Sequence, residues 1–132
     1  MSDRFLDSNV LLYFAGSDGG KAARAFELIK AGGTISTQVL NEVAHVARRK
    51  MGSSWDETSS LLADLRGLLR VVPLDLRTHE FGLELAARHE LSVWDGMICA
   101  AAVLSNCTEL LSEDMHDGLV LDGRTRIANP FR

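Results

Sequence analysis

The sequence contains little cysteine and little proline. It has two cysteines, Cys99 and Cys107, and two prolines among 132 residues. Two cysteines are too few for the disulfide framework of a small secreted domain, and they do not form a Cys-x-x-Cys pair. Both occur in or at the end of an apolar helical stretch, so we expect reduced, buried thiols. No arrangement of His and Asn supports a catalytic cysteine.

Long hydrophobic runs are absent as well. The longest candidate, Met97–Leu104, is far shorter than the roughly 18 apolar residues that a membrane helix needs. The first residues lack the basic and apolar regions of a signal peptide. These observations predict a cytoplasmic protein with no membrane partner.

Positive charge is scarce. The chain has 14 Lys and Arg residues against 18 Asp and Glu residues, a formal net charge of -4. Proteins that bind nucleic acids usually carry a basic excess. This objection weakens if several acids hold divalent cations, because bound ions reverse the local charge. Two short basic groups remain, Arg48–Lys50 and the pair Arg124 and Arg126.

The sequence has the composition of one soluble globular domain over residues 1–132. Hydrophobic residues make up 46% and charged residues 24% of the chain, which is typical of a domain with a packed core. We expect strands at residues 4–6, 34–36, 70–73 and 109–111, with short final strands at 119–121 and 126–128. We expect helices at residues 10–15, 21–31, 38–50, 55–69, 79–89 and 93–105, with Thr37, Thr78 and Ser92 as caps. This alternation predicts a three-layer α/β/α sandwich around a short parallel sheet.

Four acids are expected at one edge of that sheet. Asp7 and Asp114 directly follow predicted strands, while Glu42 and Asp95 lie early in predicted helices. Ligands of such folds bind beyond the carboxyl ends of the strands. Each acid also has a structural explanation, such as a turn for Asp7 or a capping box with Ser92 for Asp95. The argument for a site therefore depends on all four acids occurring together.

A cluster of four carboxylates requires a compensating charge. Crowded carboxylates repel one another, which raises their pKa values and reduces stability. A hard divalent cation such as Mg²⁺ or Mn²⁺ prefers oxygen ligands and removes that repulsion. It also lowers the pKa of a bound water and neutralises charge on a scissile phosphate. The sequence does not distinguish one ion from two.

Four sequence segments resemble the motifs of PIN domains, and specifically of the VapC-type toxin nucleases of toxin–antitoxin pairs. An acid followed by Ser8 and Asn9 opens the first motif, and Glu42 closes the second. Asp95 opens a helix of small residues in the third, and Asp114 lies in the fourth. The segments are Phe5–Tyr13, Ser36–Glu42, Leu91–Ala102 and Leu110–Met115. The resemblance extends over nearly the whole chain.

The resemblance implies a PIN-like fold and metal-dependent endoribonuclease activity on structured RNA such as tRNA or rRNA. It implies that the catalytic and metal-binding residues are Asp7, Glu42, Asp95 and Asp114, with Mg²⁺ or Mn²⁺ as cofactor. Ser8 and Asn9 are expected beside these acids as supporting polar groups. Asp117 is expected to help bind metal, and Glu113 is a rival for the role of Asp114. The family also implies a homodimer and inhibition by a cognate antitoxin protein.

Other functions and residues remain open at this point. A non-catalytic PIN-like module that binds RNA or protein is an alternative, although the intact set of four acids argues against it. A phosphoacceptor domain needs a lysine late in the chain, and the last lysine is Lys50. For Trp55 and Trp94 two roles are open, stacking on bases and packing in the core or an interface. Arg48–Lys50 contact phosphates or only complement the end of a helix.

Overall fold

The computed structural model describes residues 3–16 and 18–132. Strands and helices alternate through most of the chain, as the sequence predicts. In chain order the elements are β1 (Arg4–Leu6), α1 (Ser8–Phe14), α2 (Gly19–Lys30), β2 (Thr34–Ser36), α3 (Thr37–Arg49), α4 (Trp55–Leu68), β3 (Arg70–Val72), α5 (Leu76–His89), α6 (Val93–Leu104), β4 (Glu109–Leu111), β5 (Val120–Leu121) and β6 (Thr125–Ala128). None of the helices in the described ranges is long and apolar enough to cross a membrane.

The strands form one sheet in the order β3-β2-β1-β4-β6-β5. All neighbouring pairs are parallel except β5 and β6, which are antiparallel. The short connection between those two strands allows only the antiparallel arrangement, since parallel strands need a long crossover. Its backbone turns through positive φ angles at Asp122 (51°) and Gly123 (66°). The predicted parallel sheet is therefore mainly parallel, with one antiparallel edge strand.

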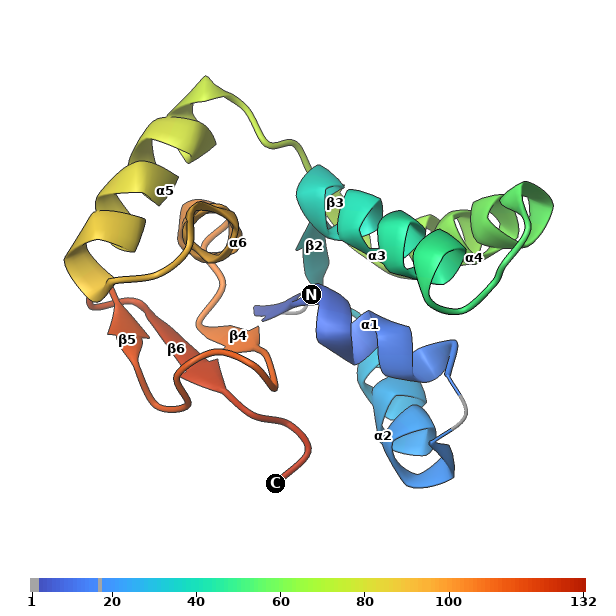
Figure 1. Cartoon of the computed structure of the whole chain (residues 1–132). Coiled ribbons are helices and arrows are strands. Elements are labelled where there is room, and N and C mark those ends of the chain that lie inside the picture. The colour runs from blue at the N-terminus through green and yellow to red at the C-terminus, as the bar shows by residue number, and fades with distance from the viewer. Residues whose placement is uncertain (1–2, 17) are drawn as a thin grey trace.

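Helices cover both faces of the sheet. Figure 1 shows α5 and α6 on one side and α1 to α4 on the other. Helix α6 is the most enclosed, because every residue from Gly96 to Val103 is buried. Strand β1 lies in the middle of the sheet, with Phe5 and Leu6 fully buried. The expected three-layer α/β/α sandwich is confirmed.

Two helices begin earlier than predicted because a different residue caps them. Ser36, rather than Thr37, is the N-cap of α3, and its Oγ accepts the amide of Val39 at 3.3 Å. Asp75, rather than Thr78, caps α5, since its Oδ1 accepts the amide of Thr78 at 2.9 Å. Ser92 caps α6 as predicted. In the two corrected helices the cap is the residue whose side chain reaches the amide three positions later.

The helices α5 and α6 approach closely through two glycines. A Cβ on Gly82 would lie 2.7 Å from the Met97 sulfur. A Cβ on Gly96 would overlap the Gly82 carbonyl oxygen and lie 2.9 Å from the Ala86 Cβ. The two helix backbones can therefore meet only where these positions lack side chains. This contact places the first turn of α6, which carries Asp95.

Replacing Gly96 with alanine is expected to lower the free energy of unfolding by about 1–3 kcal/mol, because the new methyl group collides with backbone that cannot rotate away. The matched control is Gly67 in α4, where nothing lies within 4 Å of an added Cβ. Gly67→Ala is expected to raise the free energy of unfolding by about 0.4–1 kcal/mol. Urea denaturation followed by circular dichroism measures both changes. Equal effects of the two substitutions would contradict the close approach of α5 and α6.

Candidate active site at the carboxyl edge of the sheet

The candidate site lies where the strand order of the sheet reverses. Strand β1 pairs with β2 on one side and with β4 on the other, in the register Leu6 opposite Leu111. Such a reversal opens a crevice at the carboxyl ends of the strands. The residues that follow these two strands, Asp7 and Ser112, therefore begin side by side at this edge.

Asp7 is the buried centre of the site. Its side chain is only 5% exposed, and it also serves as the N-cap of α1. Its Oδ1 accepts the amide of Ser8 at 2.7 Å, and its Oδ2 accepts the hydroxyl of Ser112 at 2.8 Å. The Asn9 amide donates to the same Oδ2 at 3.3 Å. These three donors can surround one carboxylate only because β1, α1 and the segment after β4 meet here.

Ser8 and Gln38 connect the centre to Glu42 on α3. The Ser8 hydroxyl donates to Glu42 Oε1 at 2.8 Å, and Gln38 Nε2 donates to Glu42 Oε2 at 2.9 Å. The same Nε2 donates to the backbone carbonyl of Trp94 at 2.9 Å. Gln38 therefore links the Glu42 carboxylate to the first turn of α6. Because both partners of Nε2 are acceptors, the orientation of the amide is fixed, and its Oε1 is buried without a hydrogen-bond partner among the described residues.

Asn9 connects the centre to Asp114. Its Nδ2 lies 3.2 Å from Asp114 Oδ2, while its Oδ1 accepts the backbone amide of Glu113 at 3.2 Å. Ser112 Oγ accepts the amides of Asp114 and Met115 at 3.3 Å each. These bonds turn the chain directly after β4 and hold Asp114 at the rim of the site.

Burial and mutual repulsion raise the pKa values of two of the acids. Burial is the largest cause for Asp7, whose pKa rises to about 6, and the charges of Glu42 and Asp95 add to the increase against the hydrogen bonds from Ser112 and Ser8. The pKa of Asp95 is also raised, by burial and then by the charges of Glu42 and Asp114. Each of the four acids thus acts electrostatically on at least one of the others. The structure brings all four into one region.

Glu113 and Asp117 have other partners. Glu113 Oε2 forms an ion pair with Lys21 Nζ at 2.7 Å, and Tyr13 donates its hydroxyl hydrogen to the other carboxylate oxygen. Asp117 accepts the amide of Asn129 and pairs with Arg132, each at 3.0 Å. Each of these carboxylates is therefore engaged by a basic side chain and a further hydrogen-bond donor. Within the described part of the chain, no contact joins either of them to Asp7.

Ser112 and Gln38 are the residues that sequence reasoning missed. Ser112 is fully buried, and it follows β4 as Asp7 follows β1. The rule that selected Asp7 could therefore have selected Ser112, had it been applied to hydroxyl residues as well as acids. Gln38 lies four residues, about one helical turn, before Glu42 on α3. That spacing was a usable signal for the hydrogen bond between the two side chains.

The acids are linked through hydrogen bonds to polar side chains, and they do not converge on a common centre. Within residues 3–16 and 18–132, no three or more His, Cys, Asp or Glu side chains are grouped so that they could hold a metal ion. Instead, the carboxylate oxygens accept hydrogen bonds from four polar side chains, those of Ser8, Asn9, Gln38 and Ser112. The nearby Cys99 is buried and forms no disulfide, and burial, with the charges of Asp95 and Asp7, raises its pKa to about 12. This thiol stays protonated, as expected of a structural cysteine.

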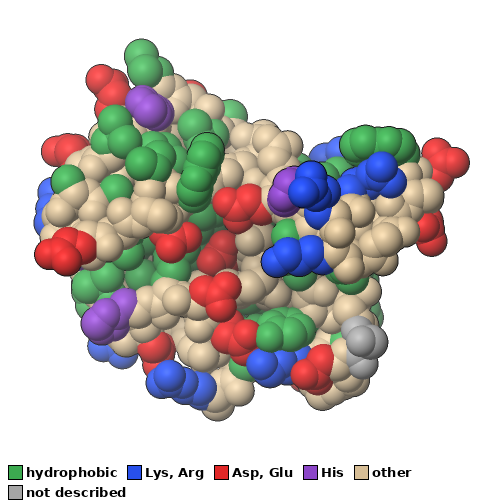
Figure 2. Space-filling view, in the orientation of Figure 1, with side chains coloured by type: hydrophobic (Ala, Val, Ile, Leu, Met, Phe, Trp, Pro, Cys, Tyr) green, Lys and Arg blue, Asp and Glu red, His purple; other side chains and the backbone are tan. Residues whose placement is uncertain are grey.

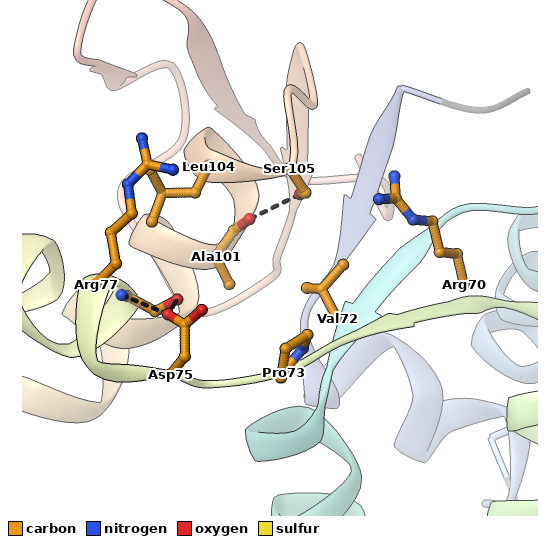
Figure 3. Close-up of a pocket in the computed structure, with 9 residues that line it drawn as sticks. Arg70, Val72, Pro73, Asp75, Arg77, Ala101, Leu104 and Ser105 are labelled. Carbon is orange, nitrogen blue, oxygen red and sulfur yellow. Dashed lines mark hydrogen bonds between the residues drawn. The ribbon is translucent and has the colours of Figure 1, made fainter.

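Two hollows of the surface differ in chemistry. Figure 2 shows acidic side chains gathered in the hollowed middle of one face, with histidine, lysine and arginine side chains beside them on the side of α3. Figure 3 shows a different pocket, of about 160 Å³, between β3, α5 and the end of α6. In that pocket Asp75 is occupied in capping α5 through Thr78, and none of the four predicted acids lines it. The acidic region at the sheet edge is thus the better candidate for chemistry.

Residues 4–116 match the family of PIN domains. The chain belongs to the PIN domain family. The match includes all four acids and ends before Asp117. No curated protein is similar enough in sequence to count as a match.

Solved structures share the fold of this PIN domain at low sequence identity. A chain of a toxin–antitoxin complex from Klebsiella pneumoniae is similar with a TM-score of 0.72 and 20% identity, over 96% of this chain and 97% of that chain. VapC20 from Mycobacterium tuberculosis, a toxin that cleaves the sarcin–ricin loop, is similar with a TM-score of 0.68 and 18% identity. The similarity covers 81% of this chain and 86% of that chain. DNA-bound VapBC from Salmonella typhimurium is similar with a TM-score of 0.67 and 19% identity, over 98% of this chain and 99% of that chain. At these identities the likeness concerns the fold.

The raised pKa of Asp7 predicts a pH-dependent cost of burying its charge. A carboxyl group whose pKa rises from 3.8 to about 6 on folding lowers the free energy of unfolding as the pH increases through that interval. Asp7→Asn removes this titration, so in EDTA the stability of the variant relative to wild type is expected to rise by about 2–3 kcal/mol between pH 4 and pH 7.

Urea denaturation at a series of pH values measures this difference. Asp64→Asn, an exposed site on α4, removes the same charge as a control and is expected to show no such dependence. A difference between Asp7→Asn and wild type that is constant from pH 4 to pH 7 would contradict the buried, repelled carboxylate.

Proposed function

We propose that this PIN domain is a metal-dependent endoribonuclease and the toxin of a toxin–antitoxin pair. The proposed reaction is hydrolysis of an RNA phosphodiester bond at the carboxylates of Asp7, Glu42, Asp95 and Asp114. The observation that carries the proposal is the buried Asp7 carboxylate at the strand-order reversal, linked through Ser8 to Glu42 and through Asn9 to Asp114. The motif resemblance and the shared fold with toxin structures support it.

The donor set fits Mg²⁺ or Mn²⁺ in its chemistry. Carboxylate oxygens are the ligands that these cations prefer. Burial is the main cause of the raised pKa values of Asp7 and Asp95, and the other acids add a repulsion that a neighbouring cation would relieve. The fit in geometry requires side-chain rotation, because the acids are not yet grouped around one point within the described ranges. When bound, such a cation lowers the pKa of a water molecule and offsets charge on the scissile phosphate.

The protein's own groups would orient the reactants. Ser8 and Asn9 hold oxygens of Asp7, Glu42 and Asp114 at fixed hydrogen-bond distances. Such supporting contacts keep ligands oriented and are typically worth about 10–100-fold in metal affinity or activity. Asp95 is half-buried and faces the same region, where it can orient an attacking water. Asp117 is not part of the proposed set, because Asn129 and Arg132 already engage its two oxygens.

The proposed partners follow from the same resemblance. We infer that the RNA substrate is a structured RNA such as tRNA or rRNA, that a cognate antitoxin protein inhibits the site, and that the domain pairs as a homodimer in the cytoplasm. The structural neighbours include toxin–antitoxin assemblies, which supports an antitoxin partner for this chain.

Cleavage of a mixed tRNA and rRNA pool tests the function directly. Purified protein freed of any copurifying partner is expected to produce discrete fragments with Mg²⁺ or Mn²⁺ and none with EDTA. Asp7→Asn is expected to reduce the cleavage rate at least about 100-fold, since it removes a charge that supports the cation. Asp64→Asn removes the same charge on exposed α4 and is expected to cleave normally.

Cleavage that survives Asp7→Asn would point to a contaminating nuclease and leave the site unsupported. An absence of cleavage with every metal, together with retained RNA binding, would favour a non-catalytic binding module.

Asp114 and Glu113 can be told apart by the same assay. Asp114→Asn is expected to reduce cleavage at least about tenfold, because the carboxylate borders Asn9 and acts on Asp95. Glu113→Gln is expected to retain most activity, because its partners are Lys21 and Tyr13 rather than the other acids. The reverse order of effects would assign the role to Glu113. Thermal denaturation of both variants separates lost activity from lost folding.

A further inference from the structure

A groove runs from the carboxylates along α3. Its larger part, about 880 Å³, is lined at the acidic end by Ser8, Glu42 and Trp94. A smaller hollow of about 280 Å³ lies further along and is lined by Arg48, Arg49 and Trp55, among others. His45 lines both, so the two parts adjoin. We call this surface the α3 track, and its members are Gln38, Asn41, His45, Arg48 and Arg49 of α3, with Trp94 and Trp55 at its two ends.

We propose that the α3 track binds an unpaired RNA segment next to the cleaved bond, with a base stacked on Trp94 and phosphates held by Arg48 and Arg49. The inference rests on the proposed ribonuclease function, and it adds the surface of this chain that holds the RNA strand beside the cleaved bond.

Helical spacing aligns the members of the α3 track. Gln38, Asn41, His45 and Arg48 follow one another at intervals of three, four and three residues, which places them on one side of a helix. The ten residue steps from Gln38 to Arg48 span about 15 Å. The track is therefore a continuous path that begins beside Glu42 at Gln38 and leads toward the basic end of α3.

Trp94 has an exposed ring and a backbone that is held in a defined place. It is 67% exposed, and it directly precedes Asp95. Gln38 Nε2 donates to its backbone carbonyl and to Glu42 Oε2, both at 2.9 Å. The backbone of Trp94 is thus fixed relative to the proposed site, while its ring adds little to the core. An exposed aromatic face stacks on bases only where they are unpaired, because bases in a duplex already stack on one another.

The opposite end of the α3 track carries the positive charge. The Arg48 guanidinium lies 4.2 Å from the ring centre of Trp55 and donates to the Ser53 carbonyl at 2.9 Å. Trp55 is nevertheless 67% exposed, and the exposed Arg49 lines the same hollow. Because the chain has a net charge of -4, a phosphate backbone needs such a local basic region. Figure 2 shows this grouping beside the acids. A basic protein segment would be repelled here, so RNA is favoured over such a partner.

Binding of a short unpaired RNA of mixed sequence in EDTA tests the proposal without requiring cleavage. Trp94→Leu keeps apolar bulk but removes the aromatic face, and it is expected to weaken binding at least about fivefold. Trp94→Phe keeps the face and is expected to weaken binding about twofold or less. Fluorescence anisotropy of the labelled RNA measures both affinities.

The salt dependence of binding tests the cationic end. Replacing Arg48 and Arg49 together with alanine is expected to reduce the slope of log affinity against log salt by about 1.4, or about 0.7 for each lost phosphate contact. The matched control replaces Arg124 and Arg126, which do not line the track. This control removes the same charge and is expected to keep the wild-type slope.

The two tryptophans provide an internal optical signal. The chain contains only these two, so Trp55→Phe leaves Trp94 as the sole tryptophan. Its fluorescence is expected to be quenched when unpaired RNA binds and to change little with a duplex of the same composition.

Three results would overturn the proposal: wild-type affinity in both Trp94→Leu and the Arg48/Arg49 variant, equal loss in the Arg124/Arg126 control, or equal quenching by duplex and unpaired RNA. Cleavage by wild type together with any of these would leave the ribonuclease function standing. Weakened binding in the track variants without any cleavage would support the track and contradict the ribonuclease.

Discussion

The burial of one carboxylate at the reversal of strand order is the constraint on which the site depends. Asp7 is 5% exposed, so its charge needs partners inside the protein. Backbone and side-chain donors of Ser8, Asn9 and Ser112 supply them. Two of these residues also donate to the other acids, Ser8 to Glu42 and Asn9 to Asp114. Satisfying one buried charge therefore organises most of the acidic region.

The helix layers set the remaining part of the site. Helix α6 delivers Asp95, and its position depends on the close contact between Gly96 and Gly82 on one side. On the other side, Gln38 ties the first turn of α6 to α3 by donating to the Trp94 carbonyl. The two faces of the sheet are thus connected at the carboxyl edge, next to the acids. Packing against α5 and a hydrogen bond from α3 therefore act on the same short segment, the first turn of α6.

The sequence was a good guide where local chemistry decides the structure. The strands at residues 4–6, 34–36 and 109–111 were predicted with the bounds that the structure has, because short apolar segments between helical patterns leave little choice. The caps of α3 and α5 were misplaced, because Ser36 and Asp75 are also good capping residues and lie one and three positions before the predicted threonines. A run of several capping residues contains more than one possible start, and the rest of the fold selects among them.

By itself the sequence determined the alternation of strands and helices and the placement of Asp7, Glu42, Asp95 and Asp114 near the carboxyl edge. Only the tertiary structure decided which side chains they contact. Ser112 meets Asp7 across 105 positions of the chain because β1 pairs with β4 in one register. Ion pairs with Lys21 and Arg132 likewise engage Glu113 and Asp117, so these two acids do not contact Asp7. Such pairs arise from strand register and helix packing, which bring distant residues together and leave no periodic pattern in the sequence.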